Sequence, residues 1–120
     1  MAKKMVVFVG SDEPQKAFPP FMLGAGAIAM DMEIMMFFTM SGLNIVKKGG
    51  AEKIELKGAP KPLTEFIGIM REAGAEMVAC SAAFDIVGCK EEDLIEGIEC
   101  GGVATFVDEA EEADIVLTFC

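Results

Sequence analysis

The sequence predicts an α/β fold in which helices cover both faces of a parallel sheet. Short apolar runs alternate along the chain with helical stretches. These runs are apolar at successive positions, a pattern typical of strands buried on both faces. The segments between them are too long for hairpins, so we expect parallel strands joined by helical crossovers. In such sheets, ligands and reactive groups collect at the carboxyl ends of the strands.

The chain divides into an alternating series of strands and helices. Strands are expected at residues 5–9, 33–39, 76–80, 98–100 and 114–119. Helices are expected at residues 17–30, 41–46, 63–73, 81–87, 91–96 and 102–113. Pro19 and Pro20 are tolerated only in a first helical turn, so the first helix is expected to begin close to Ala17. Residues 47–62 form a lysine- and glycine-rich connection without a clear period.

Length and composition predict one globular domain. The chain has 120 residues, of which 52% are apolar and 25% are charged, and this is enough to build a single core. No export signal precedes the first strand, so we expect a cytoplasmic protein with reduced thiols. Residues 17–46 are strongly apolar, but Asp31 and Glu33 interrupt them. Carboxylates are costly in lipid, so stable membrane insertion is not expected.

The net charge is −10, and the two halves of the chain differ. Residues 1–61 carry eight bases and six acids, whereas residues 62–120 carry two bases and fourteen acids. An acidic protein repels phosphate backbones, so nucleic acid is not an expected partner. Five lysines between residues 47 and 61 are interrupted by Glu52 and Glu55, and we interpret this stretch as a solvated connection.

The absence of histidine excludes several kinds of site. Ser-His-Asp and Cys-His catalysis within one chain, and histidine-ligated zinc, all require it. The chain has no CxxC pair, so neither a metal nor an iron–sulfur cluster is expected. Residues 24–29 fit the dinucleotide pattern G-x-G-x-x-A, but they lie inside a helical run rather than directly after a strand. We expect close helix packing there, and no cofactor.

Four cysteines remain as candidate reactive groups: Cys80, Cys89, Cys100 and Cys120. Cys80 ends the third strand and precedes a helix, and the N-terminus of a helix favours the thiolate. It is therefore expected to be the most alkylation-reactive of the four, although a buried cysteine that only packs is the alternative. Cys100 also lies between a strand and a helix. Cys89 lies in a turn, and Cys120 is the last residue.

Five motifs span most of the chain: "MEIMMFFTMSGL", "GAEMVAC", "FDIVG", "EEDLIEGIE" and "GGVATFVDEA". Together they resemble the DsrE/DsrF-like family of small sulfur-relay proteins, and the resemblance covers nearly the whole chain. The resemblance is strongest to the single-chain branch once labelled peroxiredoxin-like. It implies a single domain over residues 1–120, a three-layer α/β/α sandwich with a five-stranded parallel sheet, and homo-oligomers, commonly trimers or hexamers. Relay members carry a persulfide on a cysteine after the third strand, a position that matches Cys80.

The resulting hypothesis is a cytoplasmic sulfur carrier, or sulfurtransferase-like protein, that passes sulfur through Cys80. Cys100 is a candidate second thiol, sulfur donor and acceptor proteins are the expected partners, and no cofactor is required. Whether the protein is an enzyme stays open. One alternative is a thiol redox protein or sensor in which Cys89 or Cys100 resolves oxidised Cys80. The other is a non-catalytic subunit of an oligomer, with cysteines that only pack.

Overall fold

The protein, described over residues 2–120 by a computed structural model, contains one five-stranded parallel sheet. The strand order is β4-β3-β2-β1-β5, and every pair of neighbours is parallel. The strands are β1 (Lys4–Val9), β2 (Glu33–Phe38), β3 (Glu76–Cys80), β4 (Glu99–Gly101) and β5 (Ile115–Phe119). The expected five-stranded parallel sheet is therefore confirmed.

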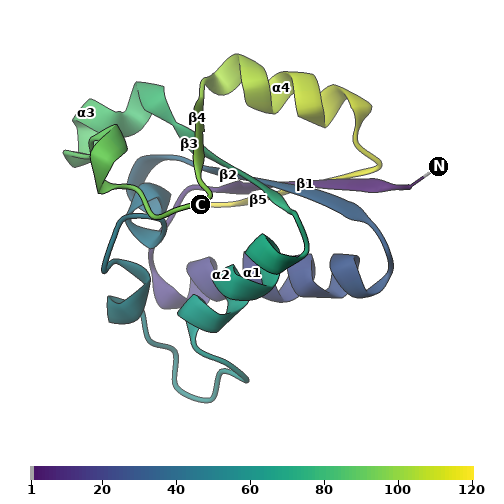
Figure 1. Ribbon diagram of the computed structural model, residues 1–120, viewed down its shortest axis with the longest axis horizontal. Coiled ribbons are helices and arrows are strands. Elements are labelled where there is room, and N and C mark those ends of the chain that lie inside the picture. Colours follow the sequence, from purple (N-terminus) through teal and green to yellow (C-terminus); the bar gives the residue numbers. More distant parts are fainter. Residues whose placement is uncertain (1) are drawn as a thin grey trace.

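Helices lie on both faces of the sheet, which confirms the three-layer arrangement. They are α1 (Pro14–Ala29), α2 (Leu63–Glu72), α3 (Phe84–Val87) and α4 (Val103–Glu112). Helices α1 and α2 pack against each other on one face, and α4 lies on the other (Figure 1). Short 3₁₀ turns at Met40–Ile45, Ala51–Lys53, Ser81–Ala83 and Glu91–Asp93 complete the connections. Among the helices of residues 2–120, none is both long and apolar enough to span a membrane.

Successive aromatic residues of β2 supply both layers of the core. Phe38 stacks on Phe21 of α1, with ring centroids 6.0 Å apart. Phe37 points to the other face, where its ring centroid is 5.3 Å from that of Phe106 in α4. Phe106 also meets Phe8 of β1 edge to face, at 5.4 Å. This alternation is the reason the central strands read as continuous apolar runs.

Helix α1 begins three residues earlier than the sequence suggests. It starts at Pro14, so Pro19 and Pro20 lie inside it rather than in its first turn. Each proline lacks an N–H, which leaves the carbonyls of Gln15 and Lys16 without intrahelical partners. Both of these residues are exposed, so water can hydrate the free carbonyls. The helix tolerates the prolines for this reason.

Three other expectations about the carboxyl-terminal half were wrong in detail. Strand β5 is not buried on both faces: Ile115 is 38% exposed and Val116 is 44% exposed, because β5 is an edge strand that α4 leaves partly uncovered. The helix expected at residues 91–96 is only the turn Glu91–Asp93, since Leu94 leaves it to form an antiparallel bridge with Lys47. The fourth strand begins one residue later, at Glu99.

Candidate functional site

The carboxyl ends of the strands form one edge of the sheet, which we call the carboxyl edge. It lies on the left in Figure 1, where the chain ends, and the amino terminus lies at the opposite side. Cys80 is the last residue of β3, and Cys120 directly follows β5. The loop after β2 contributes the turn Met40–Ile45 to the same edge. The edge therefore carries two of the four thiols.

Cys80 is a buried side chain, with 2% of its surface exposed. Its backbone is still extended, with φ −74° and ψ 106°, and it precedes the 3₁₀ turn Ser81–Ala83. The single helix expected over residues 81–87 is thus divided into this turn and the four-residue α3. Such short elements align few peptide dipoles, so they stabilise a thiolate less than one continuous helix over residues 81–87 would.

The side chain of Cys80 lies on the α4 face of the sheet. Side chains alternate between faces along a strand, and paired residues of neighbouring strands share a face. Cys80 follows Val78 by two residues, and Val78 pairs with Phe37, which contacts Phe106 of α4. Gly101 of β4 pairs with Cys80, so a Cβ on Gly101 would point to the same face of the sheet. That Cβ would lie only 2.9 Å from Cγ1 of Val78, so the close packing of β4 beside Val78 favours glycine at this position.

Cys100 lies on the opposite face and is not brought together with Cys80. It pairs with Ala79, one residue before Cys80, so the pleat turns the two thiols away from each other. Cys100 is exposed. Partial burial of its sulfur raises the pKa of the Cys100 thiol, and the nearby Glu91 and Cys89 raise it further. These effects disfavour the thiolate at neutral pH.

Cys89 is buried, with 4% exposed. It follows Gly88, whose φ of +66° ends α3. Its Sγ donates a weak hydrogen bond to the carbonyl of Lys90 at 3.5 Å. Burial raises the pKa of the Cys89 thiol, while the positive charge of Lys47 acts in the opposite direction. Cys89 is therefore held as a neutral thiol.

Cys120 shares the carboxyl edge with Cys80 but lies far along it. A Cβ added to Gly10, at the end of β1, would be 3.1 Å from Cβ of Cys120. Cys120 therefore lies at the end of β5, beside β1. Cys80 ends β3, which is three strands away from β5 in the order β3-β2-β1-β5. At the usual spacing of neighbouring strands, this is a separation of about 14 Å. The two thiols are too far apart to react within one chain.

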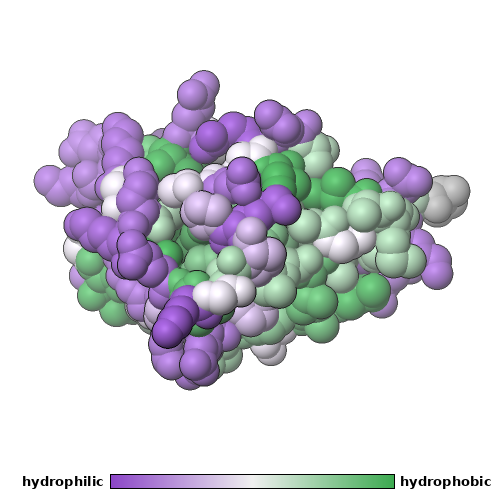
Figure 2. All heavy atoms as spheres, turned by 90° about the horizontal axis from the view of Figure 1, so that it is seen from below, coloured by the Kyte–Doolittle hydropathy of each residue, from purple (hydrophilic) through white to green (hydrophobic). Residues whose placement is uncertain are grey.

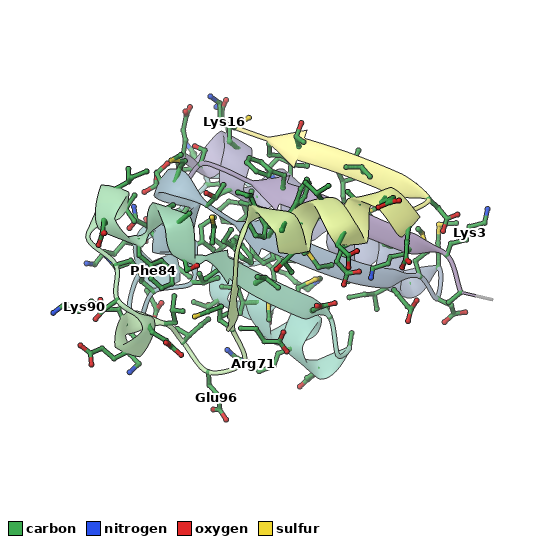
Figure 3. The ribbon with its side chains drawn as sticks, turned by 90° about the horizontal axis from the view of Figure 1, so that it is seen from above. Lys3, Lys16, Arg71, Phe84, Lys90 and Glu96 are labelled. Atoms are coloured by element: carbon green, nitrogen blue, oxygen red, sulfur yellow. The ribbon has the colours of Figure 1, made fainter. Side chains whose placement is uncertain are left out.

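The connection between β3 and β4 covers the carboxyl edge near Cys80 and is held in place at several points. Nη2 of Arg71, on α2, donates a hydrogen bond of 2.6 Å to the carbonyl of Glu96 (Figure 3). Figure 3 also shows Phe84 and Lys90, which precede Glu96 in this connection. Oγ of Ser81 donates to the carbonyl of Gly101 at 3.2 Å. The start of the connection is thereby tied to β4.

Two residues beside Cys80 have features that the sequence pattern does not single out. Continuing the pairing of Phe38 with Ala79 places Thr39 next to Cys80, and Thr39 is a buried polar residue, 5% exposed. Met40 follows with a left-handed φ of +50° and is 48% exposed. Such a conformation costs a non-glycine residue about 1 kcal/mol, and strained residues cluster at functional sites. The run Thr39-Met40-Ser41-Gly42 directly after a buried strand is the signal that could have identified them.

Within residues 2–120, no group of three or more Cys, Asp and Glu side chains is placed to hold a metal ion. What the carboxyl edge presents is the buried thiol of Cys80 at the end of a central strand, beside the strained Met40 and the buried Thr39. This thiol lies at the edge where reactive groups of parallel α/β sheets collect.

Comparisons with known proteins agree with the fold and identify relatives. The chain is 26% identical to the uncharacterized protein YrkE of Bacillus subtilis, with 96% of each chain covered. It is also 26% identical to the sulfur carrier protein DsrE2 of Allochromatium vinosum, covering 96% of this chain and 97% of that protein. The crystal structure of the ychN protein from E. coli superposes with a TM-score of 0.78 at 19% identity, covering 99% of this chain and 100% of that one. A model of the DsrE/DsrF-like family matches residues 3–119, and the chain therefore belongs to the DsrE/DsrF-like family.

Proposed function

We propose that this protein is a sulfur carrier in a sulfur relay and that Cys80 holds the sulfur as a persulfide. The observation that carries the proposal is the position of Cys80, which ends a central strand at the carboxyl edge. Reactive groups of parallel α/β sheets gather at this edge. Membership of the DsrE/DsrF-like family, and 26% identity to a protein named as a sulfur carrier, support the same role.

The transfer needs no external oxidant or cofactor. The sulfur of Cys80, as thiolate, attacks the outer sulfur of a donor persulfide R–S–SH. The S–S bond of the donor breaks, a new S–S bond forms on Cys80, and the donor leaves as the thiol R–SH with the proton that Cys80 released. An acceptor thiol then attacks the outer sulfur on Cys80 in the same manner, and Cys80 returns to its starting state.

Burial of Cys80 determines when transfer takes place. At 2% exposure, a persulfide on Cys80 is shielded from small thiols that would otherwise remove its sulfur. Transfer therefore requires the connection after Cys80 to move. The start of this connection consists of the single turns Ser81–Ala83 and Phe84–Val87, and opening it breaks the hydrogen bond from Ser81 to Gly101. Docking of a donor or acceptor protein provides that opening.

The proposal extends to partners and location. Donor and acceptor proteins deliver and remove the sulfur, and copies of the chain form a homo-oligomer. The exposed apolar residues Val103 and Val107 of α4, with Ile115 and Val116 of β5, support self-association. A cytoplasmic location fits a mechanism in which all four cysteines stay reduced.

The two alternatives differ in what they require of the thiols. A redox protein would need a second thiol close to Cys80, and Cys100 lies on the opposite face of the sheet. The raised pKa of Cys89 and of Cys100 also slows the oxidation of each thiol. A subunit that only assembles would keep Cys80 as a packing residue, and its burial suits that role equally well.

Intact mass measured after incubation with a persulfide donor tests the proposal. The parent protein is expected to gain one sulfur atom, and Cys80→Ser is expected to gain none, because a hydroxyl cannot hold a persulfide. Cys120→Ser is the matched control at the same edge and should load as the parent does. The substitution at Cys80 is nearly isosteric but buries a hydroxyl, so its unfolding free energy should fall by about 1–3 kcal/mol, which a folded domain tolerates.

Loading of Cys80→Ser would place the carrier thiol elsewhere. Unfolding of Cys80→Ser, measured by its melting curve, would identify Cys80 as a packing residue and favour the assembly alternative.

A further inference from the structure

A hollow of about 620 Å³ lies at the carboxyl edge beside the start of α1. Its charged and polar lining comes from three lysines, two carboxylates and one amide: Lys47, Lys48, Lys53, Asp12, Glu13 and Asn44. The two sides of the hollow come from different parts of the chain. The carboxylates follow β1, and the amide and lysines follow β2. The lining carries three positive and two negative side chains, an excess of positive charge in a chain whose net charge is −10.

The turn that carries the lysines is fixed by the surrounding backbone. The N–H of Lys48 donates a 2.8 Å hydrogen bond to the carbonyl of Asp93, and Lys47 bridges Leu94. Gly50 lies so close to Asn44 that a Cβ would be 1.7 Å from the carbonyl oxygen of Asn44. The backbone of residues 47–50 is thus fixed, whereas most of residues 52–61 is exposed, as expected of a solvated connection. A ligand that binds at residues 47–50 does not bear the entropic cost of ordering them.

The carboxylates of the hollow have hydrogen-bond or ion-pair partners, whereas the lysines form no ion pair with any carboxylate of residues 2–120. Oδ2 of Asp12 accepts a 3.0 Å hydrogen bond from Nδ2 of Asn44, and Oε2 of Glu13 lies 3.7 Å from Nζ of Lys16. The ion pairs formed within residues 2–120 do not involve Lys47, Lys48 or Lys53.

Nζ of Lys48 donates only to a neutral group, the carbonyl of Glu92, at 3.0 Å. The chain has twice as many acids as bases, with 20 against 10. The hollow thus holds three lysines without an ion pair against two carboxylates, one of which is offset by Lys16, and this leaves an excess of positive charge for an anion.

We propose that this hollow is a binding site for small oxyanions of the sulfate, thiosulfate and phosphate class, held by Lys47, Lys48 and Lys53. Lysine ammonium groups bind such ions as compact point charges. Pro14, the first residue of α1, also lines the hollow, so the positive end of this 16-residue helix adds to the attraction. The site is independent of the role proposed for Cys80.

Calorimetric titration with sodium sulfate and sodium thiosulfate at constant ionic strength tests the site. The variant Lys47→Gln/Lys53→Gln removes two charges from the hollow. Lys57→Gln/Lys61→Gln, at exposed positions outside it, removes two charges from the same connection and serves as the control. We expect the first variant to bind at least about tenfold more weakly than the parent, a loss of roughly 1.4 kcal/mol. The control should bind within about twofold of the parent.

The site is overturned if the parent protein produces no binding heat. It is also overturned if both variants lose affinity equally, because an equal loss reports only the change in net charge. Cys80→Ser should bind sulfate as the parent does, so failure of the sulfur-carrier role leaves this test intact. Inorganic phosphate compared with a simple phosphate monoester identifies the source of the anion. Tighter binding of the free ion indicates an inorganic ligand, and tighter binding of the monoester indicates a group carried on a larger molecule.

Discussion

Cys80 and Cys89 are buried, whereas Cys100 and Cys120 are exposed. This difference changes the order of reactivity expected from the position of Cys80 in the sequence. We predict that Cys100 and Cys120 are alkylated before Cys80 and Cys89 in the folded protein, because a reagent must reach the sulfur before thiolate character matters. Isotope-coded alkylation with peptide mass analysis measures the order, and labelling in denaturant provides the unfolded reference.

Faster labelling of Cys80 than of the two exposed thiols would contradict this prediction. It would mean that the connection after β3 opens readily without a partner protein. The sulfur-carrier proposal would then no longer need docking to expose the thiol.

A second residue-scale prediction concerns Glu76 at the amino end of β3. Burial raises the pKa of Glu76, and the negative charge of Glu109 on α4 raises it further. The pKa of Glu109 is lowered, chiefly by its hydrogen bond with Lys4. Because the pKa of Glu76 is higher in the folded state, its protonation favours folding. That stabilisation is complete below the unfolded pKa and is lost as the pH rises through the folded value.

Ionised Glu76 therefore lowers stability at neutral pH. We predict that Glu76→Gln raises the free energy of unfolding at pH 7 by up to about 1 kcal/mol, the range of partly exposed charge interactions. The gain should shrink at a pH below the ordinary glutamate pKa of 4.5. Urea unfolding at both pH values measures it. Glu55→Gln, an exposed site that loses the same charge, should change stability little at either pH; a gain that persists at low pH would assign the effect to packing.

At the scale of elements, the loop after β2 depends on glycine at one position. A Cβ on Gly42 would lie 2.2 Å from the carbonyl oxygen of Val9, a backbone atom that cannot move without displacing β1. We predict that Gly42→Ala lowers the free energy of unfolding by about 1–3 kcal/mol, as overpacking does. Gly26→Ala is the matched control: Gly26 lies in α1 with open space around it, so alanine should stabilise the helix by about 0.5–1 kcal/mol.

Thermal unfolding of the two alanine variants separates packing from backbone freedom. If Gly42→Ala has the same melting temperature as the parent, the loop after β2 accommodates the added methyl group without cost. The left-handed Met40 would then be no constraint on the edge beside Cys80.

Apolar patterning was sufficient to predict the elements that lie in the core. The sequence predicts the boundaries of β3 at Glu76 and Cys80, because a run of apolar residues ends there and small residues follow. Patterning failed where pairing rather than burial decides the structure. Leu94 leaves the turn after Glu91 to bridge Lys47, a partner distant in sequence. The edge position of β5 depends on the strand order, which apolar patterning does not specify.

The candidate site was predictable to the same extent. The end of β3 was enough to place Cys80 at the carboxyl edge. Its burial depends on the packing of the following connection, and the opposite orientation of Cys100 depends on the register between β3 and β4. Neither is a local property of the sequence. The hollow at Lys47 and Lys53 was missed because its two sides come from the loops after β1 and β2.

The whole molecule leaves apolar surface on both outer layers. On the face of α1 and α2, hydrophilic side chains gather at the left end and apolar ones occupy much of the remainder (Figure 2). Met22 and Leu23 of α1 are each more than 40% exposed, at 45% and 44%. On the other face, Val103 and Val107 of α4 are 63% and 61% exposed. Large apolar side chains exposed on both outer layers are typical of a protein that assembles.

We predict a homo-oligomer, with a trimer favoured over a dimer, and we expect α4 to lie in the contact. Val103 and Val107 are one helical turn apart and project from the same side of α4, where no residue is buried within the chain. Val107→Glu places a charge on that surface and should shift the protein toward a monomer at micromolar concentration in sedimentation velocity. Thr64→Glu, an exposed change on α2, should leave the parent's sedimentation unchanged. A parent that sediments as a monomer contradicts the assembly itself, whereas an oligomeric Val107→Glu variant moves the contact away from α4, toward Met22 and Leu23.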